Sequence, residues 1–327
     1  MPFDRLQPYS DLPLLPPAVE LETKAVLKEA IEANRMLANL RGLAAQIPNQ
    51  GVLINSIVLQ EARLSSEIEN IVTTNDELYR ADAHADGATD AHTKEVLRYR
   101  EALKFGFDAL KNRPLTTNLF VDMVRIIKQQ DIGVRRTVGA ALKDAAGEVV
   151  YTPPVGEALL RDKLTNLEQF IHADDGLDPL VKMAMQHYQF EAIHPFDDGN
   201  GRTGRILNLL YLVQAGLLDI PVLFLSRYIM ANKAAYYAGL RAVTEQQAWE
   251  PWLLYMLRGV TSTAQQTFEQ VTRIRGLMEE VRARVQRDAP GIYSKDLIEV
   301  IFRHPYTKIQ FLVDAGLAKR QTASAYL

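Results

Sequence analysis

The chain has 327 residues, of which 47% are hydrophobic, and it contains no cysteine. Its 37 lysines and arginines nearly balance its 40 aspartates and glutamates, which gives a formal net charge of −3. This composition excludes a disordered or fibrous chain and a globally basic nucleic-acid binder, although a local basic face remains open. The lack of cysteine excludes disulfides, thiolate nucleophiles and Cys-based metal sites. Any chemistry must therefore use oxygen, imidazole, guanidinium or main-chain groups.

The sequence gives no sign of a targeting segment or a membrane span. Its start has no charged region leading into an apolar stretch, as a signal peptide would. The longest apolar stretch, 206–225, contains Asn208, Asp219 and Pro221, which are unfavourable in lipid. We expect two buried segments joined by a turn there, and a soluble, cytoplasmic protein without a membrane partner.

Helical periodicity dominates the chain and predicts an all-α fold. Helices are expected over 17–43, 52–72, 95–110, 121–130, 157–172, 179–193, 201–214, 233–246 and 251–287. A polar loop is expected over 81–90. The Gly- and Val-rich segment 132–154, with a turn at Asp144–Gly147, is the one convincing β-hairpin signal.

The segment His194–Arg205 (HPFDDGNGRTGR) concentrates groups that bind phosphate. Its Gly-Asn-Gly turn opens a helix, so unpaired N–H groups and the positive end of the helix dipole form an anion site. Arg202 and Arg205 lie one turn apart and can add bidentate contacts to phosphate oxygens. Such a turn alone is common and often binds nothing, so the neighbouring residues decide the interpretation.

Two further residues of this segment point to chemistry on a nucleotide. Asp198, beside an anion site, suits a Mg²⁺ ion that it shares with phosphates. His194 can take a proton from an attacking hydroxyl near neutral pH, although a lone histidine is more often structural. Together these residues predict a polyphosphate and magnesium site with a general base.

The segment resembles the signature of the Fic family, HxFx(D/E)GNGRxxR. The eight matching positions are His194, Phe196, Asp198, Gly199, Asn200, Gly201, Arg202 and Arg205. Eight specified residues at fixed spacing arise by chance with a probability on the order of 10⁻⁸ at average composition. The resemblance implies a helical core with one β-hairpin and a reaction in which ATP gives AMP to a Ser, Thr or Tyr hydroxyl of a target protein, releasing pyrophosphate.

The resemblance also implies a role for each matched residue. His194 would deprotonate the target hydroxyl, Phe196 would be buried and pin the loop, and Asp198 would hold Mg²⁺. Because both glycines of the turn are kept, adenylylation is favoured over the phosphorylation of the family's Doc branch. The ATP-binding set in and after the turn would be Gly199, Asn200, Gly201, Arg202, Thr203, Gly204 and Arg205.

Two other segments fit this family. The hairpin at 144–154 falls where the family's flap lies, which is thought to hold an extended piece of the target by edge-strand pairing. Segment 226–237 resembles the adenine-side helix, where Asn232 would contact the base edge and Tyr236 or Tyr237 would stack. An ordinary surface hairpin and an ordinary core tyrosine pair are the alternatives.

Ser65, Glu69 and Asn70 match the family's inhibitory pattern (S/T)xxxE(G/N). So degenerate a pattern appears by chance in about one chain in four of this length, and an exposed helical glutamate is usually only solvated. Its place in the N-terminal helical region favours the inhibitory interpretation. Glu69 would then pair with Arg205, occupy the guanidinium that should hold the γ-phosphate, and leave ATP in an unproductive pose.

These features divide the chain into a helical region with the inhibitory helix (1–90), a Fic catalytic core (91–288) and a C-terminal unit (289–327). The unit resembles an incomplete winged helix whose recognition helix opens at 319–322. Its residues 293–327 carry five Lys and Arg against three Asp and Glu, a charge of +2 that is weak for a DNA binder.

The sequence leaves several functions open. The favoured one is a self-restrained protein adenylyltransferase that uses ATP and Mg²⁺, acts on a target protein and itself, and forms a homodimer, as relatives often do. An interaction or DNA-binding regulator with a nucleotide-sensing site is less favoured, because a sensor needs no base such as His194. Some relatives remove AMP with the same site, which leaves the net direction open. A metal hydrolase is disfavoured, since His187 and His194 lack a third ligand.

Overall fold

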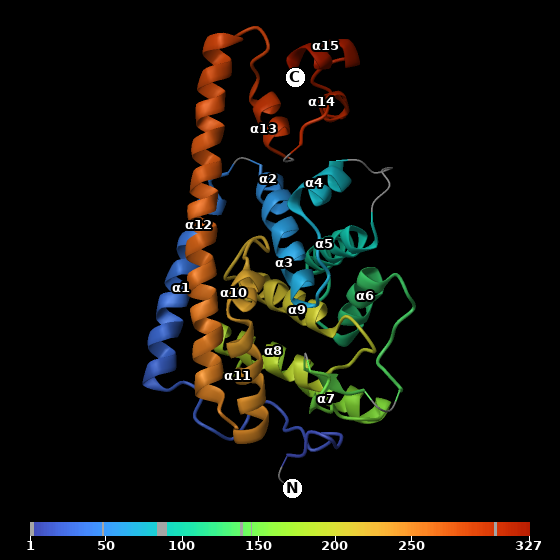
Figure 1. Ribbon diagram of the computed structural model, residues 1–327. Helices are drawn as coiled ribbons and strands as arrows, with labels where there is room; N and C mark the ends of the chain where they lie inside the picture. Colours follow the sequence, from blue (N-terminus) through green and yellow to red (C-terminus); the bar gives the residue numbers. More distant parts are fainter. Residues whose placement is uncertain (1–2, 48, 84–89, 138–139, 145, 304–305) are drawn as a thin grey trace.

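The computed structural model describes residues 3–47, 49–83, 90–137, 140–144, 146–303 and 306–327. Over these residues the chain is mostly helical and carries one short antiparallel β-hairpin (Figure 1), which confirms the predicted fold class. Within the same ranges, no helix combines the length and the apolar character that crossing a membrane requires.

The helices before the hairpin are α1 (Lys24–Ala44), α2 (Gly51–Leu53), a π-helical turn (Ile54–Val58), α3 (Leu59–Ile68), α4 (Asn75–Ala83), α5 (Ala91–Ala109) and α6 (Thr117–Lys128). Periodicity placed the start of the first helix at residue 17, which is wrong. Thr23 caps α1, because its hydroxyl accepts a hydrogen bond from Val26 N at 3.3 Å. Helix α4 was not predicted, and residues 84–89 of the expected polar loop lie outside the described residues.

The hairpin consists of β1 (Leu142–Lys143) and β2 (Val149–Tyr151), with Leu142 opposite Tyr151. Asp144 builds its turn, because the Asp144 carboxylate accepts hydrogen bonds from Ala146 N at 2.9 Å and Glu148 N at 3.0 Å. This turn agrees with the one predicted at 144–147, of which Ala145 lies outside the described residues.

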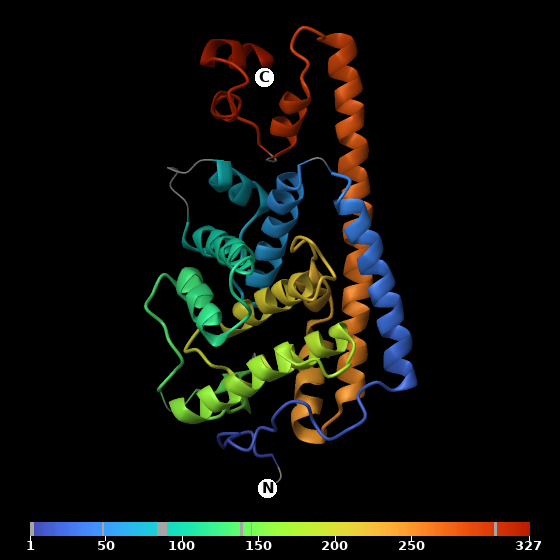
Figure 2. The same cartoon turned by 180° about the vertical axis from the view of Figure 1, so that it is seen from behind.

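The later helices are α7 (Glu157–His172), α8 (Pro179–Ile193), α9 (Asn200–Gln214), α10 (Leu225–Ala231), α11 (Lys233–Gln246) and α12 (Trp249–Asp288). The 40-residue α12 runs along one side of the molecule with α1 beside it (Figures 1 and 2). Trp252 of α12 is fully buried and donates a hydrogen bond from its indole to Ala184 O of α8 at 2.8 Å. The apolar stretch 206–225 turns at Gly216, as expected, after α9 ends.

Helices α8 and α9 lie in the middle of the fold. Almost every residue of both is buried, polar residues such as Gln186, His187 and Asn208 included, and their sequences therefore show little amphipathic pattern. The loop 194–199 joins them and carries most of the signature found in the sequence. The core therefore holds this loop between two rigid elements.

The C-terminal unit has a small hydrophobic cluster of its own (Figure 1, red). Its helices are α13 (Lys295–Arg303), α14 (Ile309–Asp314) and α15 (Arg320–Tyr326). Leu297, Val300, Leu312 and Ala323 are its buried residues. Lys319 and Arg320 are exposed at the start of α15, where the sequence placed the opening of a recognition helix.

Candidate active site

The loop between α8 and α9 is fixed by its own main chain and by one amide. His194 ends α8 in the left-handed conformation, and Gly199, with φ of +82°, precedes α9. Asn200 holds the loop closed, because its side chain donates to Phe196 O at 2.7 Å and accepts from Phe196 N at 2.8 Å. Phe196 itself is buried, with 1% of its surface exposed. Among the described residues, no side chain caps the first N–H groups of α9, which leaves the start of this helix suited to an anion.

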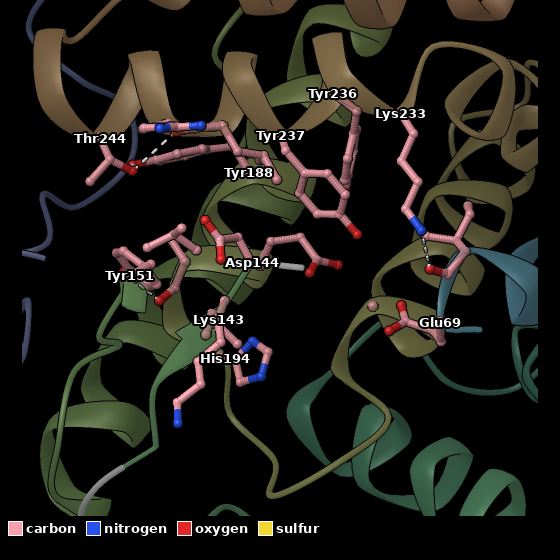
Figure 3. A pocket seen from close by; sticks show the side chains of 18 of the residues that line it. Glu69, Lys143, Asp144, Tyr151, Tyr188, His194, Lys233, Tyr236, Tyr237 and Thr244 are labelled. Carbon is pink, nitrogen blue, oxygen red and sulfur yellow. Dashed lines mark hydrogen bonds between the residues drawn. The ribbon is translucent and has the colours of Figure 1, made fainter. Parts of the chain in front are cut away.

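A cavity of about 800 Å³ lies beside this loop (Figure 3). Helix α11 forms one wall, the hairpin forms the facing wall, and α8, α9 and the end of α3 complete it. The lining residues labelled in Figure 3 are Glu69, Lys143, Asp144, Tyr151, Tyr188, His194, Lys233, Tyr236, Tyr237 and Thr244. The cavity is large enough for a nucleotide.

Arg205 of α9 is held by the end of α3. Its Nη2 donates to Glu69 Oε1 at 2.8 Å and to Ser65 O at 2.9 Å, and its Nε donates to Ser65 Oγ at 2.7 Å. Arg205 is only 3% exposed, so this pairing satisfies a buried charge. A Cβ at Gly201 would collide with the Glu69 carboxylate and lie 2.9 Å from Arg205 Nη1. Glycine therefore leaves room for the pair.

The ion pair is present at neutral pH. Burial of Glu69 opposes its ionisation, but the attraction of Arg205 and Arg202 outweighs burial and lowers the pKa of the Glu69 carboxyl from its usual value. Asn70 follows in the left-handed conformation and also lines the cavity. Ser65 and Glu69 of the inhibitory pattern thus contact Arg205, and Asn70 lines the cavity beside them.

Arg202 faces a second group of charges. Its Nη1 lies 2.6 Å from Glu95 Oε1 of α5, and the same oxygen lies 3.0 Å from Lys128 Nζ of α6. Lys128 Nζ also lies 2.6 Å from Asp198 Oδ2. Burial opposes ionisation of Glu95, but Arg202 and Lys128 outweigh it and lower the pKa of its carboxyl. The sequence did not point to Glu95 or Lys128, since each looks like an ordinary charge on an amphipathic helix.

Asp198 suits a magnesium ion by the chemistry of its donors. Its side chain is 60% exposed, and it offers a single carboxylate beside the start of α9. One carboxylate and phosphate oxygens are a usual ligand set for Mg²⁺. The Lys128 ammonium, which neutralises Asp198 here, would have to yield to the ion. Over the residues that the structure describes, no three His, Cys, Asp or Glu side chains are grouped to hold a metal.

His194 is a neutral base. Burial, assisted by the positive charge of Arg135, lowers the pKa of its imidazole to about 4. Arg135 is itself buried and fixes the His194 main chain by donating from Nε to His194 O at 2.8 Å. Its Nη2 also donates to Pro154 O, just after the hairpin. Arg135 thus joins His194 to the segment that follows the hairpin, a contact that no sequence pattern indicated.

Two further carboxyl groups lie near Arg205, the buried Glu61 and the half-buried Glu191. Glu61 of α3 accepts hydrogen bonds from Ser226 N at 3.1 Å and from Ser226 Oγ, and burial raises the pKa of its carboxyl to about 7. Glu191 of α8 lines the cavity, and burial, with a smaller contribution from Glu69, raises the pKa of its carboxyl to about 7 although Arg205 lowers it. Neither carboxyl was singled out in the sequence.

Of the residues predicted to contact adenine, the two tyrosines line the cavity and the asparagine does not. Tyr236 and Tyr237 line the cavity, and the buried Tyr236 hydroxyl lies 2.8 Å from His187 Nε2. Asn232 does not line it, because its amide donates to Tyr228 O at 2.9 Å in the turn between α10 and α11. Helical periodicity could not reveal that turn. Thr244, three turns further along the chain, lines the cavity instead.

The remaining residues of the predicted ATP-binding set divide between the cavity and the core. Gly201 and Arg205 line the cavity. Thr203 is fully buried and donates from its hydroxyl to Gly199 O at 2.9 Å, so it stabilises the start of α9. Gly204 packs under the Glu191 carboxylate.

Three family models match the chain. The model described as Fic/DOC family N-terminal matches residues 27–108, and the model described as Fic/DOC family matches residues 114–212. The model described as protein adenylyltransferase SoFic-like, C-terminal domain, matches residues 277–327. Together they span most of the chain, including the C-terminal unit.

Curated relatives carry the name protein adenylyltransferase. Protein adenylyltransferase fic-1 of Caenorhabditis elegans is 31% identical over 117 residues, which cover 32% of this chain and 22% of the relative. A probable protein adenylyltransferase of Aquifex aeolicus is 38% identical over 85 residues, which cover 26% of each. The chain spans about a quarter of the length of these curated relatives.

Solved structures share the fold. A Fic family protein from Desulfovibrio desulfuricans superposes with a TM-score of 0.62 at 20% identity and covers 98% of this chain and 89% of that one. Fic-1 from C. elegans superposes with a TM-score of 0.58 at 20% identity and covers 76% and 74%. These likenesses show a Fic fold.

Proposed function

Because the chain belongs to the Fic/DOC family, we propose that it transfers AMP from ATP to a Ser, Thr or Tyr hydroxyl of a target protein, and to itself. One observation carries this proposal. The neutral imidazole of His194 faces a cavity that also holds Arg205 and adjoins the uncapped start of α9. A base next to an anion site is the arrangement that attack of a hydroxyl on a phosphate requires.

In the proposed step, the target hydroxyl oxygen forms a bond to the α-phosphorus of ATP. The bond from that phosphorus to the oxygen bridging to the β-phosphate breaks, and its electron pair leaves with pyrophosphate. His194 accepts the hydroxyl proton. The uncapped N–H groups of α9 and the two arginines would hold the phosphates in line with the incoming oxygen. No covalent intermediate with this chain is needed, in agreement with the absence of cysteine.

Magnesium would be held by Asp198, where it would neutralise charge on the leaving pyrophosphate. Lys128, which lies 2.6 Å from Asp198 in this structure, would then return to Glu95 alone. Arg202, whose partner here is Glu95, would contact the β-phosphate. Without nucleotide, the charged side chains of this site are paired with one another. With ATP and Mg²⁺ bound, the phosphates and the ion would replace these pairs.

The proposal includes a brake. Glu69 occupies Arg205, so the γ-phosphate would lack its cation, and ATP would settle in a pose that does not align the α-phosphorus with the target hydroxyl. Release would require Glu69 to leave Arg205. We further propose that the protein works as a cytoplasmic homodimer, as the family resemblance implies, with the hairpin edge contacting the target. A DNA-binding role for the C-terminal unit is less favoured, because its charge is small.

Labelled ATP and mass spectrometry test the activity. The full chain with Glu69→Gly, incubated with Mg²⁺ and ATP, should gain the mass of one or more adenylyl groups. It should take up label from the α-phosphate and none from the γ-phosphate. His194→Ala in the same background should take up neither. Uptake of γ-label would show phosphorylation and contradict the proposal, and so would α-label uptake that survives His194→Ala.

A further inference from the structure

One carboxylate oxygen of Glu191 lies in the cavity without a hydrogen-bond partner among the described residues. Glu191 lies on α8, and its Oε1 is buried and accepts no hydrogen bond within the described residues. Burying a polar group without a partner is costly, and a leucine of similar size would fill such a place at lower cost. The missing partner therefore points to a ligand that brings hydrogen-bond donors into the cavity.

Gly204 leaves the space that the Glu191 carboxylate occupies. A Cβ at Gly204 would lie 2.5 Å from Glu191 Oε1 and 3.0 Å from the Phe190 ring, so any other residue would displace the carboxylate or the ring. Gly204 is outside the eight signature positions, where residue 204 is unspecified. Gly204 of α9 and Glu191 of α8 therefore pack closely, and the carboxylate position depends on glycine at 204.

The order of residues along α8 shows which part of a nucleotide would reach Glu191. Tyr188, Glu191 and His194 are spaced by three residues on the cavity side of α8. Tyr188 lies at the α11 end, where its hydroxyl lies 3.0 Å from Thr244 Oγ1 (Figure 3). His194 lies at the reacting end. Glu191 therefore lies between the side that would take the base and the side that would take the α-phosphate.

In ATP, the ribose lies between the base and the α-phosphate, and its 2′- and 3′-hydroxyls are hydrogen-bond donors. An ionised carboxylate only accepts hydrogen bonds, and acidic residues bind ribose hydroxyls in dinucleotide-binding folds. We propose that Glu191, seated on Gly204, accepts hydrogen bonds from the ribose hydroxyls of ATP and makes the site select ribonucleotides over deoxyribonucleotides. This inference rests on the proposed function.

A different role for Glu191 would be to pair with Arg205 when Glu69 leaves. In this structure three hydrogen bonds from Arg205 go to Ser65 and Glu69, and none goes to Glu191. A reserve partner of Arg205 would alter the affinity for every nucleoside triphosphate equally. A ribose contact would alter only the ratio between ATP and its deoxy analogues, so the ratio separates the two roles.

The test measures binding of ATP, 2′-deoxy-ATP and 3′-deoxy-ATP with Mg²⁺ by calorimetry at pH 8, above the pKa of about 7 of the Glu191 carboxyl, so that this group is ionised. The full chain carries Glu69→Gly to free Arg205 and His194→Ala to prevent turnover. In this background we expect ATP to bind roughly ten- to a hundred-fold more tightly than at least one deoxy analogue, as a hydrogen bond to a charged group implies. Adding Glu191→Leu should reduce that preference to about two-fold or less.

Three further variants serve as supporting tests and as a control. Glu191→Gln, which keeps one acceptor, should give an intermediate ratio even if the leucine variant folds poorly. Gly204→Ala should lower the ratio while the carboxylate charge is kept. Glu29→Leu, on α1 away from the cavity, should leave the ratio unchanged.

The outcomes are distinct. An unchanged ratio after Glu191→Leu and Glu191→Gln overturns the inference alone, because ATP still binds. A change in the preference for ATP over inosine triphosphate, with no change for the deoxy analogues, also overturns it and assigns Glu191 to the base. Failure of the background to bind ATP at all contradicts the proposed function as well.

Discussion

Glu69 Oε1 lies 2.8 Å from Arg205 Nη2, and this ion pair joins the end of α3 to the second turn of α9. Arg205 is buried, and Ser65 supplies two further acceptors to it. The inhibitory segment and the candidate active site therefore share one guanidinium. Under the proposed function, whatever loosens α3 from Arg205 should raise adenylylation.

Ser65→Ala should release the brake in part. The substitution removes the acceptor of Arg205 Nε, a bond of 2.7 Å to a charged donor, while Glu69 stays in place. We expect self-labelling from α-labelled ATP to rise by up to roughly ten-fold, the value of one such bond, and to stay below that of Glu69→Gly.

Ser66→Ala is the matched control for that variant. Ser66 is also buried on α3, but its hydroxyl makes no hydrogen bond within the described residues. It should leave labelling unchanged. If Ser65→Ala behaves like Ser66→Ala, the serine contact does not contribute to the brake.

Glu95→Gln should destabilise the protein and make it more responsive to ATP. The change removes the ionic partner of Arg202, which is 2% exposed, and of Lys128. Breaking such a buried pair costs about 1–3 kcal/mol of the free energy of unfolding. Because a triphosphate would return negative charge, Mg²⁺ and ATP should raise the melting temperature of Glu95→Gln more than that of the unmodified chain.

Glu101→Gln, at an exposed position of the same helix, is the control. Thermal unfolding followed by circular dichroism, with and without nucleotide, measures both effects. Equal melting temperatures for the two variants would mean that Glu95 does not support Arg202.

Activity should persist as the pH falls through 6.5. Burial lowers the pKa of His194 to about 4, so the imidazole stays neutral and able to accept a proton well below the usual pKa of histidine. Initial rates of α-label uptake by Glu69→Gly at saturating ATP, so that protonation of Glu191 does not limit binding, should change little from pH 7.5 to 5.5 while circular dichroism shows a folded chain. A ten-fold loss per unit beginning near pH 6.5 would contradict this assignment.

Stability should depend on pH through Glu61. Its pKa is raised in the folded protein to about 7 from 4.5, so the folded chain holds a proton that the unfolded chain loses between these values. Stability is therefore lost as the pH rises through this window, by up to roughly 3 kcal/mol. Urea unfolding at pH 5 and pH 8 should show that Glu61→Gln reduces this loss, while the part due to Glu191, whose pKa is also raised to about 7, remains.

Glu67→Gln, on the partly exposed side of α3, should keep the loss and serves as the control. The same loss of stability in Glu61→Gln and in the unmodified chain would show that the buried carboxyl is not its source.

Much of the fold was predictable because local pattern and tertiary burial agree. The predicted bounds of α7, α8 and α11 match the structure. Helix α4 was missed although its signal was present. Thr74 and Glu77 form a capping box, in which Thr74 N donates to Glu77 Oε2 at 3.0 Å and Glu77 N donates to Thr74 Oγ1 at 3.2 Å.

The site was predictable where its residues are contiguous in the sequence. The loop 194–205 and the Ser65, Glu69 pattern could be recognised as strings. Glu95, Lys128 and Arg135 could not, because each comes from a different part of the chain and has a side chain that usually lies in solvent. The meeting of α5, α6 and α9 brings Glu95 and Lys128 to Arg202, and the segment after α6 brings Arg135 to His194.

We propose that this site adenylylates and that Glu69 restrains it. The most direct measurement compares uptake of label from α-labelled ATP by the unmodified chain, Glu69→Gly, His194→Ala and the double variant, at equal concentration and with Mg²⁺. We expect low uptake by the unmodified chain and no uptake when His194 is replaced. For Glu69→Gly we expect a rise of roughly ten-fold or more, because the variant loses a charge-assisted hydrogen bond. Equal uptake by the unmodified chain and Glu69→Gly would contradict this proposal.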